Sequence, residues 1–338
     1  MTAVTDPSAD EGGFLSSLGR SFFSPGRGAD PGERFDPARD AGYPDPPPRK
    51  GFFTDTSVCI GCKACEVACK EWNAVPEDGI ALTGMSYDNT GGLGGSTWRH
   101  VAFIEQQLPA AGQGGALPDT VDLGLPTATL PGADPEHREH ADFRWLMESD
   151  VCKHCTHAAC LDVCPTGALF RTEFGTVVVQ DDICNGCGYC VPACPYGVID
   201  RRDGPAGDPA VGLAQKCTLC YDRLSDGMEP ACAKACPTES IQFGDLDELR
   251  ERAQGRLDML VESGETTAQL YGHDPGDGVG GTGAFFLLLD EPEVYGLPPD
   301  PVVTTKDLPD MWRQAVLAAA TLLGGAAAAF IGAGGGRR

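Results

Sequence analysis

The chain has 338 residues, 16 of them cysteines, and its 49 acidic and 25 basic side chains give a formal net charge of −24. This acidity excludes a nucleic-acid surface, because binding to a phosphate backbone demands clustered lysine and arginine. A chain of this length buries a core without disulfides, so the cysteines indicate a role other than cross-linking.

The first 48 residues are predicted to form a disordered tail. Gly, Pro, Asp and Arg dominate residues 1–48, and no periodic apolar face develops there. The segment lacks the basic start and uninterrupted apolar stretch of a signal peptide. Order is expected to begin with a strand over 51–55, which leads into the first cysteines, and to continue as a helix over 67–72.

The cysteines fall into four groups of four. The first and third groups have the spacing C-x2-C-x2-C-x3-C, which is the run of bacterial ferredoxins. A predicted strand over 98–106 and a Gly/Pro-rich surface insert over 107–141 separate the first group from the second. His154 and His157 lie inside the second group and are expected to be structural or tuning residues, not ligands. In chain order the groups are Cys59, Cys62, Cys65 and Cys69; Cys152, Cys155, Cys160 and Cys164; Cys184, Cys187, Cys190 and Cys194; Cys217, Cys220, Cys232 and Cys236.

Groups of four thiolates suit a [4Fe–4S] cubane, in which each iron takes one sulfur ligand from the protein. Sixteen ligands in fours predict four such clusters. Zinc also binds four cysteines and favours C-x2-C pairs, so structural zinc is the alternative. The ferredoxin spacing favours iron–sulfur, as does the proline after the last cysteine of three groups, at positions 165, 195 and 237.

The fourth cysteine of a ferredoxin run usually ligates the other cluster of a pair. The second and third groups are neighbours in the chain, which leaves the first to pair with the fourth. We therefore expect an inner module, residues 149–202, inserted into an outer one, residues 49–148 and 203–250. The predicted ligand sets are Cys59, Cys62, Cys65 and Cys236 (first set); Cys217, Cys220, Cys232 and Cys69 (second set); Cys152, Cys155, Cys160 and Cys194 (third set); Cys184, Cys187, Cys190 and Cys164 (fourth set).

Residues 251–307 are predicted to be a packing helix and a C-terminal extension. The helix is expected over 245–264, with Asp245 and Glu248 in a capping-box pattern. Residues 278–283 match G-x-G-x-x-G, yet a dinucleotide site requires a strand before this motif and a helix after it. Here a turn precedes it and a predicted strand over 284–290 follows, so we expect no nicotinamide cofactor. The apolar stripe predicted for the helix comprises Leu246, Leu249, Ala253, Leu257 and Leu260.

The uncharged segment 314–336 is long enough to cross a membrane as a helix. Its Ala and Gly content makes insertion marginal by hydrophobicity alone but lets helices approach closely in lipid. We predict a transmembrane anchor over 308–338 that packs against a partner, with Trp312 at the interface. A flexible Ala/Gly tail is the alternative.

Together these motifs closely resemble the iron–sulfur (beta) subunit of membrane-bound respiratory formate dehydrogenases, over about residues 51–332. The cysteine runs alone fit many molybdoenzyme partner subunits, whereas the stretch GVGGTGAFFLLLDEPEVYGLPPDP followed by one helix is typical of the formate dehydrogenase branch. The resemblance carries CIGCKACEVACKEWN at 59–73, VCKHCTHAACLDVCPTGAL at 151–169, ICNGCGYCVPACPYGV at 183–198 and KCTLCYDRLSDGMEPACAKACPT at 216–238.

This resemblance implies an α+β fold, with two ferredoxin-like [4Fe–4S] dicluster modules, one inserted in the other, and a single C-terminal transmembrane helix. It implies a non-catalytic electron-transfer subunit, with no catalytic residue of its own. Electrons would pass from a catalytic alpha subunit holding a molybdenum or tungsten bis-pterin to a membrane cytochrome b gamma subunit and then to quinone. The alternatives are the same role beside another molybdopterin oxidoreductase, of the polysulfide or tetrathionate reductase type, and a non-redox structural metal-binding protein.

The resemblance also implies a single-pass protein of the cytoplasmic membrane whose globular part lies outside. We expect export with the partner, on a twin-arginine signal that the partner carries. The positive charges do not decide the side, because Lys306 and Arg313 precede the span while Arg337 and Arg338 follow it. The cytoplasmic side therefore stays open.

Overall fold

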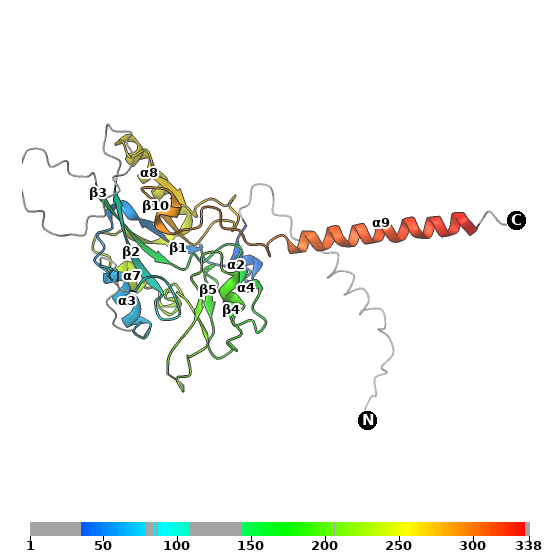
Figure 1. Ribbon diagram of the computed structural model, residues 1–338, viewed down its shortest axis with the longest axis horizontal. Coiled ribbons are helices and arrows are strands. Elements are labelled where there is room, and N and C mark those ends of the chain that lie inside the picture. The colour runs from blue at the N-terminus through cyan, green and yellow to red at the C-terminus, as the bar shows by residue number, and fades with distance from the viewer. Residues whose placement is uncertain are drawn as a thin grey trace, which may run out of the picture. The chain divides into compact units, whose positions relative to one another are not determined.

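The computed structural model describes residues 35–78, 84, 87–88, 90–107, 143–205 and 207–334 (Figure 1). Its α-helices are α2 (Pro37–Asp40), α3 (Ala64–Trp72), α4 (Ala159–Asp162), α5 (Cys190–Ala193), α6 (Tyr221–Ser225), α7 (Ala231–Lys234), α8 (Leu246–Glu262) and α9 (Leu308–Gly334). Its strands are β1 (Lys50–Asp55), β2 (Arg99–Gln107), β3 (Phe143–Val151), β4 (Leu169–Arg171), β5 (Val177–Val179), β6 (Asp200–Arg201), β7 (Ala214–Gln215), β8 (Ile241–Asp245), β9 (Gln269–Tyr271) and β10 (Ala284–Leu288). Two short 3-10 helices are η1 (Thr56–Val58) and η3 (Pro292–Tyr295).

A four-stranded sheet in the order β8-β1-β10-β9 forms the base on which the cysteine loops are built. Strand β1 pairs in parallel with β10 and antiparallel with β8. Both central strands are almost wholly buried, as apolar runs covered on two faces should be. The strands predicted over 51–55 and 284–290 are confirmed. The C-terminal extension predicted over 251–307 thus supplies β10, a central strand of the sheet that holds β1 and β8.

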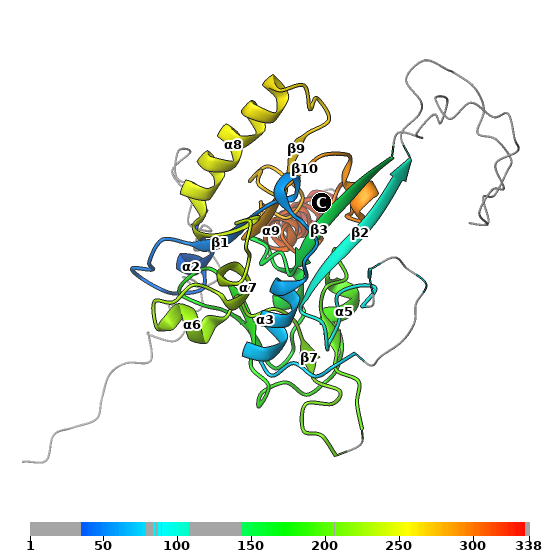
Figure 2. The ribbon, with the colours of Figure 1, turned by 90° about the vertical axis from the view of Figure 1, so that its left-hand side faces the viewer.

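Alternate residues of the central strands face two different cores, because side chains along a strand point to opposite faces. On one face Phe53 stacks on Phe285 with ring centroids 5.3 Å apart, and both pack against helix α8. Figure 2 shows α8 beside β1. On the other face Phe52 and Ala284 join a core that contains several cysteines. The sheet therefore separates a purely apolar layer from the layer that holds the cysteines.

Helix α8 has the predicted apolar stripe but not the predicted capping box. Leu246, Leu249, Ala253 and Leu260 are buried, and Leu257 packs against them. Asp245 occupies the N-cap position, yet its side chain makes no capping hydrogen bond. It pairs instead with Lys50, the residue opposite it in the β1–β8 register. The capping-box prediction is wrong because this cross-strand ion pair takes the carboxylate.

Strands β2 and β3 form a two-stranded antiparallel ribbon that links the first and second cysteine groups. Its register runs from Arg99 opposite Val151 to Gln107 opposite Phe143. The strand predicted over 98–106 is confirmed with its bounds shifted by one residue. The insert predicted over 107–141 lies outside the described residues except for Gln107, which ends β2. Two further hairpins, β4–β5 and β6–β7, separate the later cysteine groups.

The C-terminal helix α9 begins six residues before the uncharged segment and ends at Gly334. Its stretch Asp310–Ile331 is long and apolar enough to cross a membrane, and none of it is buried against the rest of the chain. The helix predicted over 314–336 is confirmed as far as residue 334. Trp312 is exposed at its first turn.

The predicted tail over 1–48 is wrong for its last part, since residues 35–48 are described and include helix α2. Pro37 and Ala38 in α2 are buried, and Tyr43 donates a hydrogen bond to the carbonyl of Arg171 at 3.3 Å. A proline that begins a short helix and one buried alanine are too few for a periodic apolar pattern. Residues 1–34 lie outside the described residues.

Candidate metal-cluster sites

All sixteen cysteines are free thiols in the described residues, and the first predicted set lines one cavity: Cys59, Cys62, Cys65 and Cys236. Cys59 and Cys62 come from the loop between η1 and α3, and Cys65 lies in the first turn of α3. Left-handed backbone at Gly61 (φ 63°) and Lys63 (φ 57°) bends this loop tightly. A side chain at Gly61 would also collide with the Phe103 ring, 2.6 Å from its Cβ, so glycine is required there.

Cys69 lies one turn further along α3 than Cys65 and belongs to the second set, with Cys217, Cys220 and Cys232. Burial raises the pKa of Cys69 to about 12, and charge on Cys232 and Cys220 adds to this rise. The Asn73 side-chain amide lies 3.7 Å from the Cys69 sulfur and 4.0 Å from the Cys220 sulfur. One helix thus brings thiols from distant parts of the chain together.

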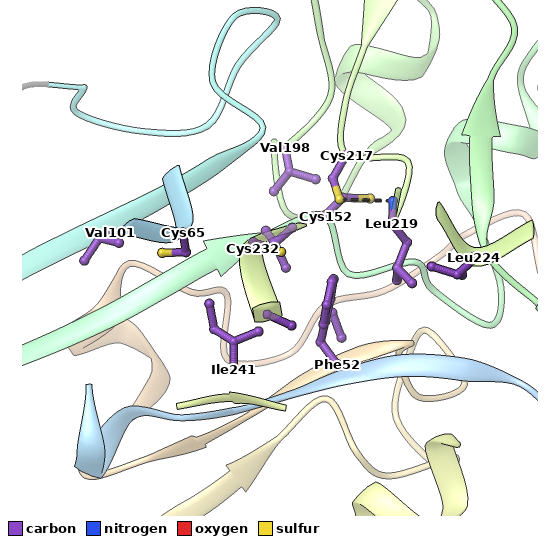
Figure 3. Close-up of a cluster of buried hydrophobic side chains, with 13 residues drawn as sticks. Phe52, Cys65, Val101, Cys152, Val198, Cys217, Leu219, Leu224, Cys232 and Ile241 are labelled. Carbon is purple, nitrogen blue, oxygen red and sulfur yellow. Dashed lines mark hydrogen bonds between the residues drawn. The ribbon is translucent and has the colours of Figure 1, made fainter. Parts of the chain in front are cut away.

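The second set lies in the layer beneath the sheet. Figure 3 shows Cys217 and Cys232 among the side chains of Phe52 and Leu219. The backbone N–H of Leu219 donates to the Cys217 sulfur at 3.2 Å. Leu219 and Cys220 have left-handed backbone, which turns this second cysteine loop as Lys63 turns the first.

The third and fourth sets each line a further cavity. Cys152, Cys155, Cys160 and Cys194 share one with Lys153, His154, Tyr196 and Lys216, among others. Cys164, Cys184, Cys187 and Cys190 share the other with Thr166 and Asn185, among others. In both cases three thiols come from one cysteine group and the fourth comes from its neighbour. In three of the four predicted sets the members line one cavity, and the assignment of ligands to clusters stays a prediction.

Neighbouring sets are close enough to influence one another. Burial raises the pKa of Cys65 in the first set to about 11, and charge on Cys232 in the second set adds to it. Burial likewise raises the pKa of Cys217, with a contribution from Cys152 of the third set. The pKa of Cys160 is raised to about 12 by burial, with a contribution from Cys190 of the fourth set. Each set therefore lies near the next one, and we infer from this proximity a row in the order first, second, third, fourth.

Exposure of the thiols differs along this order. Cys62 in the first set and Cys187 in the fourth are exposed, and they are the only exposed cysteines of the sixteen. Every thiol of the second set is buried. In the third set Cys152 is buried and the other three thiols are half-buried. Solvent therefore reaches the thiols most easily at the two ends of the row.

Buried cations accompany the thiols, although the chain as a whole is acidic. Arg99, Lys153 and Lys216 are each only 1% exposed. The Lys216 ammonium donates to the carbonyl oxygens of Val177 and Cys217. Lys153 pairs with Asp150 and lies 4.6 Å from the centroid of the Phe286 ring. Positive charge beside buried sulfurs favours their thiolate form, which is the form that binds metal.

The donor set fits an iron–sulfur cluster better than a single zinc ion. Three of the sets each line one cavity with all four of their cysteines. A cubane places its four cysteine ligands around a larger body than one ion. The thiols present therefore suit a [4Fe–4S] group.

Two features support the third set, and only the first of them was expected from the sequence. The first is His154, whose Nδ1 accepts a hydrogen bond from the backbone N–H of Val177 at 3.1 Å, so in the neutral ring the proton lies on Nε2. Burial, with the charges of Lys216 and Arg171, lowers the pKa of His154 and keeps it neutral. The expectation of a structural histidine fits this buried position.

The other support is the glycine-rich loop 278–283. The backbone N–H of His157 donates to the carbonyl of Val279 at 2.9 Å, and that of Thr156 donates to the carbonyl of Gly281 at 3.0 Å. A side chain at Gly280 would meet the His157 ring at 2.5 Å. The loop precedes strand β10, as predicted, and it braces the second cysteine group.

Comparison with known proteins supports this chemistry. Two family models, each described as a 4Fe-4S dicluster domain, match residues 58–168 and 143–246. A formate dehydrogenase iron–sulfur subunit of Haemophilus influenzae is 37% identical over 282 residues, covering 82% of this chain and 77% of that protein. The iron–sulfur subunit of the nitrate-inducible formate dehydrogenase of Escherichia coli is 36% identical over 78% of this chain and 76% of its own length.

A more distant relative is the B subunit of the anaerobic dimethyl sulfoxide reductase of Escherichia coli. It is 33% identical over 60% of this chain and 76% of its own length. The two dicluster models match overlapping ranges that follow one another along the chain. The nested arrangement of modules therefore stays a prediction.

Proposed function

The chain belongs to the family of formate dehydrogenase iron–sulfur subunits, and from this premise we propose that it relays electrons from a formate-oxidising catalytic subunit to the membrane. The observation that carries the proposal is the row of four thiol sets whose two ends alone have exposed cysteines, Cys62 and Cys187. A relay needs an accessible entrance and exit with a shielded path between them. A site for substrate chemistry would not need this arrangement.

We assign one [4Fe–4S] cluster to each thiol set, which makes four clusters. When bound, such clusters supply reversible one-electron transfer at potentials that the protein tunes. The thiolates of each set would hold the irons, and burial of the second set would keep water from the middle of the row. The assignment implies that the inner module, with the third and fourth sets, is inserted in the outer module.

The end of the row that faces the membrane is assigned from the chain leading into α9. Val303, shortly before α9, is buried against Ala159 in α4. Thr305 donates a hydrogen bond to the carboxylate of Asp162 at 2.5 Å. Helix α4 contains Cys160 and ends just before Cys164. The chain thus leaves for α9 beside the third and fourth sets, which supports an exit at Cys187 and an entrance at Cys62.

The partners follow from these two ends. We propose a catalytic alpha subunit with a molybdenum or tungsten bis-pterin at the Cys62 end. At the Cys187 end we propose a membrane cytochrome b gamma subunit that passes electrons to quinone. Helix α9 would span the membrane and pack against that subunit, because its Gly and Ala residues allow close helix contact in lipid.

A second candidate is the same relay beside a different molybdopterin oxidoreductase. The similarity to the dimethyl sulfoxide reductase subunit favours keeping it, since 33% identity extends over 60% of this chain. The formate dehydrogenase relatives match about four-fifths of the chain and therefore favour formate. Formate-dependent and sulfoxide- or polysulfide-dependent electron transfer in the purified complex would separate the two.

The cofactor count tests the proposal directly. Protein purified without oxygen is expected to contain about sixteen irons and sixteen sulfides per chain, because four cubanes each hold four of both. Iron and acid-labile sulfide analysis of the full complex, corrected for cofactors of the other subunits, measures this. Stoichiometric zinc, or iron for fewer than three clusters, would contradict it.

We further propose that the globular part lies outside the cytoplasmic membrane. Protease added to intact spheroplasts is then expected to digest it while cytoplasmic marker proteins survive. Complete protection in spheroplasts, with cleavage only in inverted vesicles, would place the relay in the cytoplasm.

A further inference from the structure

We propose that Arg99 sets the reduction potentials of the first and second clusters by holding a fixed positive charge and two N–H donors between Cys65 and Cys232. This inference rests on the proposed function, since it requires clusters at these thiols. Arg99 is neither a cluster ligand nor part of any cysteine motif. Its charge is expected to raise the reduction potential of the second cluster more than that of the first.

The position of Arg99 is rigid. The residue begins strand β2 and is only 1% exposed. Its Nη1 donates to Ser149 twice, to the hydroxyl at 2.9 Å and to the carbonyl at 3.1 Å. Its guanidinium carbon lies 4.9 Å from the centroid of the Phe52 ring. The charged head is therefore held on one side by strand β3 and on another by an aromatic face.

The remaining donors of Arg99, Nε and Nη2, are buried, and neither makes a hydrogen bond to an oxygen or nitrogen within the described part of the chain. Burial raises the pKa of Cys232, and both the charge of Arg99 and a side-chain hydrogen bond from it oppose that rise. A buried charged group with unpaired donors is costly, so such donors indicate an acceptor that belongs there. Burial opposes the charge of Arg99, but the nearby thiols outweigh this effect and raise its pKa, Cys232 first and Cys65 next. The two donors thus lie where sulfur acceptors of two clusters would be.

A purely structural role explains less of this arrangement. Arg99 does tie β2 to β3 through Ser149, but the ribbon is already paired along nine residues of each strand. That role uses Nη1 alone. Ser149 also lies 3.2 Å from the Cys65 sulfur, hydroxyl oxygen to sulfur, so the anchor of the guanidinium itself touches a first-set ligand. Arg99 is therefore linked to the first-set thiol Cys65 through Ser149.

The sign of the effect follows from charge. Reduction adds an electron to a cluster, and a nearby positive charge with hydrogen bonds to sulfur stabilises the reduced form. Arg99 therefore raises the potential. The second cluster should respond more than the first, because Phe52, against which the guanidinium packs, shares its buried cluster with two thiols of the second set, Cys217 and Cys232, and with one buried thiol of the first, Cys65.

The test uses the full chain, purified anaerobically with its accompanying subunits, and measures each cluster's midpoint potential by spectroscopically monitored redox titration. Cys65→Ser and Cys217→Ser assign the signals of the first and second clusters. In Arg99→Gln, reduction of the second cluster is expected to become about tenfold less favourable. This corresponds to a midpoint potential that is lower by about 59 mV for a one-electron couple. The first cluster should shift less in the same direction, and the third and fourth should not shift. Arg99→Lys keeps the positive charge but loses the planar array of N–H donors of the guanidinium, so it should give a smaller shift of the midpoint potential.

The matched control is Arg144→Gln. Arg144 lies in the same ribbon at the opposite end, where it pairs with Asp290 at 2.5 Å, and its loss should leave all four potentials unchanged. Unchanged potentials in Arg99→Gln, or an equal shift of all four clusters, would overturn the proposal. If Arg99→Gln fails to assemble, Arg99→Lys decides, and no shift of its second cluster counts against Arg99. A wild-type chain that lacks the clusters by iron and sulfide analysis would instead contradict the proposed function.

Discussion

Replacing Cys236 by alanine is expected to remove the cluster held by Cys59, Cys62 and Cys65, although Cys236 lies far from them in the sequence. Cys236 lines the same cavity as those three thiols, and its loss leaves one iron of a cubane without a protein ligand. Iron content should fall from about sixteen to about twelve per chain. Because the proposed relay places the sets in series, formate should no longer reduce quinone. Iron analysis, spectroscopy of the remaining clusters and quinone reduction measure these effects.

Two further variants serve as comparisons for Cys236→Ala. Thr238→Val alters the lining of the same cavity without removing a sulfur, and it should keep all four clusters. Cys187→Ala breaks the row at its other exposed end, so formate should still reduce the remaining clusters while quinone stays oxidised. In Cys236→Ala formate should reduce none of them. Selective loss of the cluster at Cys217, Cys220 and Cys232 in Cys236→Ala would show that the interleaved assignment is wrong.

Cysteine spacing carries most of what the sequence could reveal about the site. The fixed intervals predict loops that converge on one body, and the ferredoxin rule of exchanged fourth ligands predicts that Cys236 lies with Cys59 and that Cys69 lies with Cys217. Cys236 lines one cavity with Cys59, and charge on Cys69 contributes to the raised pKa of Cys217, while the ligand sets themselves stay a prediction. Local helix and strand patterns were also readable, as in the stripe of α8 and the apolar run of β10. In each case residues close in sequence determine the feature.

Features that depend on the pairing of strands far apart in the sequence could not be predicted. Strand β10 pairs in parallel with β1 across more than two hundred residues, and an apolar run does not say which strand it will join. Asp245 has a capping pattern, but the cross-strand Lys50 takes its carboxylate. Arg99 is an ordinary charged residue in the sequence, and only the β2–β3 register brings it to Ser149 and the thiols. Its buried position became visible only once the strands were paired.

A chain that ends at Asp307 is expected to keep its clusters, lose the membrane and fail to reduce quinone. Helix α9 begins at the next residue, and its stretch Asp310–Ile331 buries nothing against the rest of the chain, so deletion should leave the globular core intact. The chain up to that point is held by buried Val303 and by the Thr305–Asp162 hydrogen bond. Membrane fractionation, iron content and quinone reduction with formate measure the three effects.

A point variant separates the loss of a membrane span from the loss of chain length. Leu322 and Leu323 lie in the middle of α9 and are exposed, so replacing both by lysine leaves the globular core untouched. Each lysine costs about 2.5–3.5 kcal/mol at the centre of a membrane helix, and this is large for a helix that is mostly alanine and glycine. The double variant should therefore fail to insert, as the truncated chain does. A control chain that ends after Gly334 keeps the whole helix and should stay in the membrane. If the truncated chain and the lysine variant both remain membrane-bound and still reduce quinone, α9 is no anchor and the cluster-bearing part is held by its partners alone.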